Sequence, residues 1–330
     1  MSVYPYSKIS LVPNYGILKS RQDAKTMVAF NRKFYRLPVC VSNMSSVMSN
    51  QLAKWMSENE YFYLMHRFNG IKNKKDLKWF IEKANNENWC DINISLGVKL
   101  EDSALIDWII ANEYRVDAIC LDIAHGWSVN MKGMLSYINS VWKKNKPFII
   151  AGNVATKQAI IDLNSWGADC CKVFIGPGYA CETYKQTGFA TLGTFSTALA
   201  CCDEPPCSII LDGGIRDNGD FTKSLVAGMQ NNNHSVLTMA GSLFAACVDS
   251  PAETWSETGD VAYKIYYGSA SRKNGNRKNI EGREIMLECN SMTYEQKLKE
   301  IEESLQSAIS YAGGSNLEAF KNVKWVINES

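Results

Sequence analysis

Eight short apolar runs recur along the 330-residue chain, and they constrain its fold more than any other feature. The runs are rich in Val, Ile, Tyr and Cys and are bounded by turn residues, which is typical of strands buried in a parallel sheet. Amphipathic stretches of helical pattern lie between several of them, at 50–60, 74–86 and 157–166. The runs span 37–42, 61–65, 91–97, 117–124, 147–151, 169–175, 208–211 and 235–240.

The spacing of these runs predicts an α/β fold in which strands alternate with helices. Eight such units in one chain favour a single (β/α)8 TIM barrel over residues 1–330. An open, doubly wound sheet is the alternative. That fold more often has a G-x-G-x-x-G turn directly after an early strand, and the sequence contains none there.

The charge balance of the chain argues against strongly acidic binding partners. Lys and Arg total 35 against 34 Asp and Glu, so the net charge is +1 and neither nucleic acid nor an acidic membrane surface is expected as a partner. No apolar run approaches the roughly 18 residues of a membrane span. The chain starts MSVYPYSKIS, without a basic-then-apolar leader, and we therefore expect a cytoplasmic protein.

Eleven cysteines are many for a chain of this length, and adjacent pairs occur at 170–171 and 201–202. A reducing cytosol keeps thiols free, so a disulfide framework is not expected. The pairs lack the C-x2-C spacing of zinc sites, which leaves metal binding as the weaker interpretation. Most of these cysteines are expected to be small buried hydrophobes.

Polar and glycine residues follow the apolar runs, where a barrel of this type carries its active site. The loops after the last two runs contain Gly213-Gly214 and Gly241-Ser242, and such loops commonly hold phosphate through backbone N–H groups. Asp212, beside them, is placed to accept hydrogen bonds from ribose hydroxyls. The alternative is a pair of ordinary turns with an Asp helix cap.

The loop that follows the sixth run reads FIGPGYACET over residues 174–183. Glycines around a proline expose carbonyl groups that can surround a monovalent cation, here those of Gly176, Gly178 and Cys181. The same loop would carry Cys181 to the mouth of the barrel. A thiolate is a strong nucleophile toward an electron-poor carbon such as C2 of a purine. On composition alone, one cysteine among eleven remains a weak candidate.

Ordered motifs across nearly the whole chain resemble the GMP reductases, especially the bacterial branch of the family that they share with the IMP dehydrogenases. The IGPG sequence before the cysteine favours the reductases, since the dehydrogenases usually have GSGSICIT in this loop. The absence of CBS modules within the barrel sequence also favours the reductases. The motifs are ISLVPN, ENEYFYLMHRF, DIAHG, GNVATKQAI, GADCCKVFIGPGYACETYKQTGF, ILDGGIRDNGD, AGSLFAA, YYGSAS, NIEGRE and LQSAISYAGG.

The resemblance implies reduction of GMP to IMP and ammonia by NADPH, with Cys181 forming a covalent bond to C2 and with Thr183 and Glu281 relaying protons. It also implies K+ as the cation, a homotetramer, an active-site flap at about 268–290 and a C-terminal helical segment. His66-Arg67 would lie on the route of the cofactor or form a core His with a surface Arg. The remaining implied contacts are substrate binding by Asp212, Gly213, Gly214, Gly241, Ser242, Ser269, Ala270 and Gly282, and cofactor binding by Asp122, Ala124 and Gly126.

Some residues depart from the family pattern. Phe174 stands where the family usually has Gly, Arg272 where the bacterial branch has Glu, and Cys247 where it has His. Glu182 is a carboxylate directly after the nucleophile, which opposes formation of a thiolate. Of these departures, Phe174 and Arg272 leave dGMP or a modified purine nucleotide open as the substrate. An IMP dehydrogenase-like enzyme and a catalytically silent nucleotide-binding relative also stay open.

Overall fold

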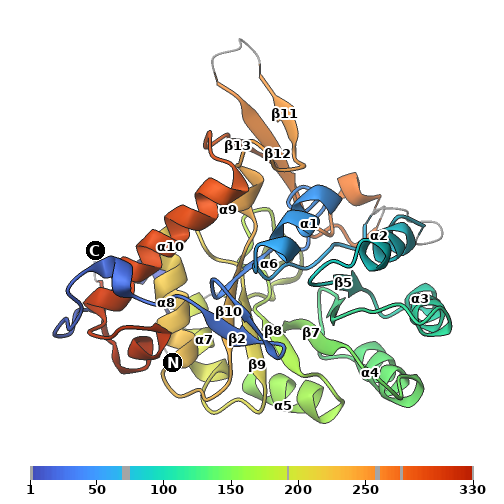
Figure 1. Cartoon of the computed structure of the whole chain (residues 1–330), viewed down its shortest axis with the longest axis horizontal. Helices are drawn as coiled ribbons and strands as arrows, with labels where there is room; N and C mark the ends of the chain where they lie inside the picture. Colours follow the sequence, from blue (N-terminus) through green and yellow to red (C-terminus); the bar gives the residue numbers. More distant parts are fainter. Residues whose placement is uncertain (1–2, 69–74, 192, 257–260, 276–277, 329–330) are drawn as a thin grey trace.

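A curled parallel sheet of seven strands forms the centre of the protein in the computed structural model (Figure 1). The structure describes residues 3–68, 75–191, 193–256, 261–275 and 278–328. The strand order is β4-β10-β9-β8-β7-β6-β5, so β5 to β10 lie side by side in their order along the chain and β4 lies beside β10. This order excludes the doubly wound alternative. The strands are β4 (Val39–Val41), β5 (Asn93–Leu96), β6 (Ala118–Asp122), β7 (Phe148–Val154), β8 (Cys170–Val173), β9 (Ser208–Asp212) and β10 (Val236–Ala240).

The run at 61–65 is the one predicted strand that is not assigned as a full strand. It makes two isolated parallel bridges, from Tyr63 to Val41 of β4 and from Met65 to Ile94 of β5. These contacts place the run between the two edge strands of the seven-stranded sheet. Two single bridges do not make a continuous ladder, which is why the sheet itself has seven strands rather than the expected eight.

Helices cover the outer face of this sheet, and the three predicted helical stretches are confirmed to within two residues at each end. Side chains of Ser49, Ser128 and Thr156 cap α1, α4 and α5 by accepting backbone N–H groups. The helices are α1 (Asn50–Glu58), α2 (Lys75–Asn86), α3 (Leu100–Ala111), α4 (Val129–Val141), α5 (Lys157–Ser165), α6 (Thr183–Thr187), α7 (Thr194–Cys201), α8 (Asn218–Met229), α9 (Ser242–Ala245) and α10 (Tyr294–Tyr311).

Two small antiparallel sheets lie outside the central one. β1 (Ile9–Val12) pairs with β14 (Lys324–Ile327), so the two ends of the chain lie together (Figure 1). β11 (Glu253–Trp255), β12 (Tyr263–Tyr267) and β13 (Glu284–Glu288) form a three-stranded sheet that projects from the main body. The segment expected to be a flap begins where β12 ends and includes β13; its residues 276–277 lie outside the described part.

A hairpin of β2 (Val28–Phe30) and β3 (Lys33–Tyr35) packs against the inner surface of the central sheet. The ring of Phe30 meets Phe62 edge-on at 4.9 Å and Phe148 at 5.1 Å between centroids, and Tyr35 meets Phe62 at 5.3 Å. Edge-to-face contacts of this kind add to the burial of the rings. The hairpin therefore fills the inner surface with aromatic side chains.

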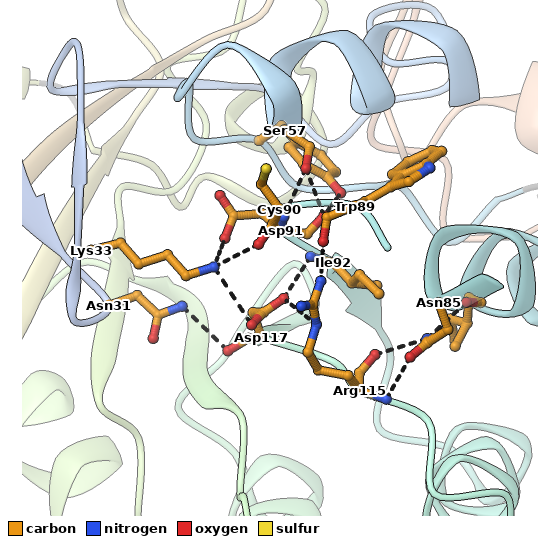
Figure 2. Close-up of polar contacts among 12 residues, drawn as sticks. Asn31, Lys33, Ser57, Asn85, Trp89, Cys90, Asp91, Ile92, Arg115 and Asp117 are labelled. Atoms are coloured by element: carbon orange, nitrogen blue, oxygen red, sulfur yellow. Dashed lines mark hydrogen bonds and ion pairs between the residues drawn. The ribbon is translucent and has the colours of Figure 1, made fainter. Parts of the chain in front are cut away.

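Charged side chains hold the hairpin to the sheet at the start of β5 and β6 (Figure 2). Lys33 pairs with the buried carboxylate of Asp91 and lies 3.6 Å from Asp117. Arg115 approaches Asp117 at 3.4 Å, and Asp117 also accepts the Ile92 N–H at 2.8 Å. Burial raises the pKa of Asp91, and the charge of Lys33 opposes that shift. This end of the strands is where a (β/α) fold places stability rather than chemistry.

Lys33→Met is expected to lower the free energy of unfolding by about 1–2 kcal/mol at pH 7, because the variant leaves the Asp91 carboxylate buried without its partner. Lowering the pH protonates Asp91 in the variant and removes that charge, so the loss should shrink toward pH 4. Urea unfolding at the two pH values measures both effects. An equal loss at both would contradict this role for the ion pair.

The cysteines are free thiols, and most behave as the sequence predicts. Cys40, Cys120 and Cys170 lie in the inner hydrophobic cluster, where burial raises the pKa of each thiol. In the described part of the chain, no group of three or more His, Cys, Asp or Glu is arranged to hold a metal ion. Nor does that part contain a helix both long and apolar enough to span a bilayer.

Candidate active site

A cavity of about 970 Å³ opens at the carboxyl ends of the central strands. Its volume is at the upper end of the usual range for ligand sites and suits a nucleotide together with part of a second ligand. Of the residues predicted to form the site, only Gly126 does not line it. The lining includes Asp122, Ala124, Gly176, Gly178, Cys181, Thr183, Asp212, Gly213, Gly214, Gly241, Ser242, Ser269, Ala270, Glu281 and Gly282.

Three of these side chains form a hydrogen-bonded chain. The Sγ atom of Cys181 lies 3.2 Å from Oγ1 of Thr183, which donates to Oε2 of Glu281 at 2.7 Å. A hydroxyl has a single proton, and that of Thr183 is directed to the carboxylate, so the Cys181 thiol is the donor to Thr183. The arrangement can carry a proton from the thiol to Glu281 and back.

The backbone brings Glu281 to the cysteine although the two residues are far apart in the sequence. Cys181 and Gly282 form an antiparallel bridge, flanked by a hydrogen bond from the Glu182 N–H to the Glu281 carbonyl at 2.7 Å. A Cβ added at Gly268 would lie 3.0 Å from the Cα of Gly282 and from the Ala180 carbonyl oxygen, so the two segments cross at close range there. The segment after β12 therefore lies directly against the loop of the nucleophile.

Lys172 of β8 joins two carboxylates inside the cavity and was not predicted as a site residue. Its Nζ atom donates to Asp122 at 2.7 Å and to Asp212 at 2.8 Å, and its side chain is only 4% exposed. Burial lowers the pKa of Lys172, but the two carboxylates outweigh it and raise that pKa well above its usual value. Burial likewise opposes ionisation of Asp122, whose pKa is nevertheless held low by Lys172 and Arg67. Both carboxylates are thus fixed in position.

The proposed phosphate end lies where β9 and β10 finish. Gly213 and Gly214 have φ values of +100° and +80°, a region that favours glycine. The buried Tyr266 stands over the second loop, because a Cβ added at Gly241 would meet its hydroxyl at 2.6 Å. Tyr266 and Arg216 line the cavity beside these loops and were also not predicted from the sequence.

Two of the three residues predicted to bind the cofactor line the main cavity. Asp122 and Ala124 line the cavity, whereas Gly126 packs on β7, where a Cβ would meet the Gly152 carbonyl carbon at 2.8 Å. A second, mostly apolar cavity of about 430 Å³ shares Ala124, Ile175, Thr183 and Glu281 with the first. Thr183 and Glu281 therefore stand between two hollows.

His66 and Arg67 have different surroundings. His66 is buried, with Nδ1 accepting the Phe68 N–H at 3.3 Å, and burial lowers its pKa to about 4. Arg67 lines the main cavity. The pair is therefore a core histidine followed by an arginine of the site.

Acidification should destabilise the protein through His66. The folded-state pKa of about 4 lies below the unfolded value of about 6.5, so below pH 6.5 the unfolded chain binds a proton that the folded chain does not. The free energy of unfolding should fall by roughly 2–3 kcal/mol between pH 6.5 and pH 4 from this group alone. Urea unfolding over this range checks it, and the fall should be shallower in His66→Gln, which cannot titrate.

The departures from the family pattern lie mostly outside the cavity. Arg272 and Cys247 do not line it, so neither is placed to select a substrate. Phe174 does line it and has a φ of +100°, and its carbonyl accepts a hydrogen bond from Nδ2 of Asn153 at 2.7 Å. A glycine adopts that backbone conformation without strain, which fits the Gly that the family resemblance predicts at this position.

The comparisons with known proteins decide the family. The IMP dehydrogenase / GMP reductase domain matches residues 3–327. The chain belongs to the IMP dehydrogenase/GMP reductase family. GMP reductases of Mycoplasma mycoides subsp. mycoides SC and Helicobacter pylori are each 39% identical to it, over 99% of this chain and 98% and 97% of their own lengths. A GMP reductase of Staphylococcus epidermidis is 40% identical, over 99% of this chain and 97% of its own.

Proposed function

We propose that this protein is a GMP reductase, which converts GMP and NADPH to IMP, ammonia and NADP+. The observation that carries the proposal is the Cys181–Thr183–Glu281 chain inside a cavity large enough for a nucleotide. The full-length similarity to proteins named GMP reductase supports the same activity. A protein that only binds nucleotides has no need of this hydrogen-bonded trio.

In the proposed first half-reaction, Glu281 takes the thiol proton through Thr183, and the Cys181 thiolate forms a bond to C2 of the guanine ring. C2 is electrophilic because it lies between ring nitrogens. The amine is a poor leaving group until it is protonated, so Glu281 returns the proton through Thr183 and ammonia departs. The proton lost by the thiol thus leaves on ammonia, and the nucleotide stays bonded to sulfur.

In the second half-reaction C2 gains a hydrogen and loses the sulfur, and the nucleotide leaves as IMP. Bound NADPH supplies the hydride. The released thiolate recovers a proton from solvent. Solvent can reach it because Cys181 is partly exposed. We propose that Ser269, Ala270 and Gly282 contact the base, and that Asp212, Gly213, Gly214, Gly241 and Ser242 contact ribose and phosphate.

The residues present suit both implied ligands. Asp122 lines the main cavity and Ala124 lines both cavities, and Thr183 and Glu281 also line both. Asp122 and Ala124 would hold the nicotinamide end of NADPH there, and the cofactor would supply the hydride for C2. For K+, the carbonyls of Gly176, Gly178 and Cys181 belong to one loop, and a 3.0 Å hydrogen bond from the Cys181 N–H to the Gly178 carbonyl closes its turn at 178–181. That carbonyl keeps a second lone pair for a cation. Replacing K+ by Li+ should lower turnover if the turn binds it.

Absorbance at 340 nm tests the function directly. The purified protein should oxidise NADPH when GMP is added and not when nucleotide is omitted. Turnover with dGMP alone would keep the chemistry and change the substrate, while reduction of NAD+ by IMP without any reductase activity would favour a dehydrogenase. Tight GMP binding with no turnover by either route would favour the silent relative.

We further propose that the chain is one domain with a closed (β/α)8 barrel, a flap at about 268–290 and a C-terminal helical segment. The bridges made by Tyr63 and Met65 support closure, because they join β4 to β5 through the run at 61–65. A cytoplasmic homotetramer is proposed from the family resemblance. Sedimentation velocity of the purified protein tests the assembly, and a monomer would contradict it.

A further inference from the structure

Three consecutive residues of the nucleophile loop each contact the segment that carries Glu281. Cys181 bridges Gly282 through the backbone, and Thr183 donates its hydroxyl to the Glu281 carboxylate at 2.7 Å. Glu182, which lies between them, donates its N–H to the Glu281 carbonyl at 2.7 Å. The residue before Cys181 also takes part, because the Ala180 carbonyl accepts the Arg283 N–H at 2.9 Å. The alignment of Glu281 with Thr183 therefore depends on how these two backbone segments pair.

A side-chain ion pair lies on the same two segments. Oε1 of Glu182 is 3.0 Å from Nε of Arg283, and the Glu182 side chain is only 17% exposed. Lys185 approaches the other carboxylate oxygen at 3.3 Å, but it belongs to α6, next to the nucleophile loop, and not to the segment of Glu281. Of these two ion pairs, the one with Arg283 ties the two segments together. Neither Glu182 nor Arg283 lines the cavity, so neither is placed to touch the nucleotide.

We propose that Glu182 and Arg283 are positioning residues, whose ion pair holds Glu281 in register with Cys181 and Thr183 during the reaction. The inference rests on the proposed reductase function. Arg283 also brings a compensating positive charge to the partly buried carboxylate of Glu182. The ion pair thus adds a side-chain contact to the backbone hydrogen bonds that align the two segments.

A double-mutant cycle in kcat tests the proposal. Glu182→Gln and Arg283→Gln should each lower kcat by about three- to tenfold, the size of effect expected for a partly buried ion pair, with KM for GMP unchanged within about twofold. The double variant should be no slower than Arg283→Gln, because both lack the ion pair and also the 3.5 Å hydrogen bond from Nη2 of Arg283 to the Tyr179 carbonyl. Lys185→Gln is the matched control, since it removes the other partner of Glu182, and its kcat should stay within about twofold of the wild type.

Three results would contradict the role proposed for this ion pair. If Glu182 acts only by opposing the thiolate, Glu182→Gln should be as active as the wild type or more active, and the proposal is wrong. Losses that add in the double variant, or an equal loss in Lys185→Gln, would also overturn it.

Hydrogen exchange of the peptide at 281–284 gives a second readout that needs no reductase activity. Its amides should exchange faster in Glu182→Gln and Arg283→Gln than in the wild type and Lys185→Gln, and unchanged exchange would count against the ion pair as a positioning contact. If the wild type is inactive with GMP but the four proteins still differ in exchange as expected, the proposed function is refuted. The contact between the two segments would then still be established.

Discussion

Cys181→Ala is expected to lower GMP-dependent oxidation of NADPH by at least about a thousandfold. The physical reason is that the proposed route has no other way to displace the amine, because hydride addition follows formation of the bond from sulfur to C2. GMP should still bind, since the ribose and phosphate contacts proposed above do not involve the thiol. Steady-state rates at 340 nm, together with calorimetric titration of GMP, separate the two effects.

Cys289→Ala is the matched control for this variant. Cys289 is also a partly exposed free thiol, but it does not line the cavity. Its replacement should leave the rate within about twofold of the wild type, as for an ordinary substitution away from the site. Retention of appreciable activity in Cys181→Ala would show that the nucleophile has been misassigned.

Lys172→Met is expected to destabilise the protein by about 3–5 kcal/mol at pH 7. The variant leaves the carboxylates of Asp122 and Asp212 facing each other without the buried cation that holds them at 2.7 and 2.8 Å. The raised pKa of Lys172 shows that its charged form stabilises the folded protein. The raised pKa of Lys172 contributes stability that is present below its unfolded value and is lost only as pH rises through the folded value, so the contribution is complete at pH 7.

Urea unfolding at pH 7 and pH 4 measures this loss. Acid protonates at least one of the two crowded carboxylates in Lys172→Met, so the deficit should shrink at the lower pH. Lys157→Met is the control, because Lys157 pairs with Asp203 on the surface and should cost less than about 1 kcal/mol. Equal losses in the two lysine variants would contradict the role assigned to the buried charge.

The strand and helix pattern was predictable because burial on both faces leaves continuous apolar runs. Seven of the eight predicted runs form the central sheet, and the eighth, at 61–65, makes only bridges. The hairpin of β2 and β3 was not predicted, since its strands of three residues are too short to show a period. Its place depends on contacts with Phe62 and Asp91, which are distant in the sequence.

Within the site, the family resemblance pointed to the residues on the loops, and the structure brings all but Gly126 to one cavity. Lys172 was missed although the sequence carries a signal for it, namely a charged residue inside the apolar run at 169–175. A lysine buried in a strand requires partners, and Asp122 in the run at 117–124 and Asp212 directly after the run at 208–211 are the carboxylates that supply them. Nothing in the sequence shows that Glu182 and Arg283 meet, because that contact depends on how distant segments pair.

The most direct test of the central claim, hydride delivery to C2 of the purine, uses NADPH deuterated at both C4 positions. The protein is incubated with GMP, and the IMP formed is examined by mass spectrometry and NMR. We predict one deuterium per IMP at C2, with one ammonia released for each NADPH oxidised and no product from Cys181→Ala. IMP without deuterium, or no IMP in the presence of both substrates, would contradict the proposed mechanism.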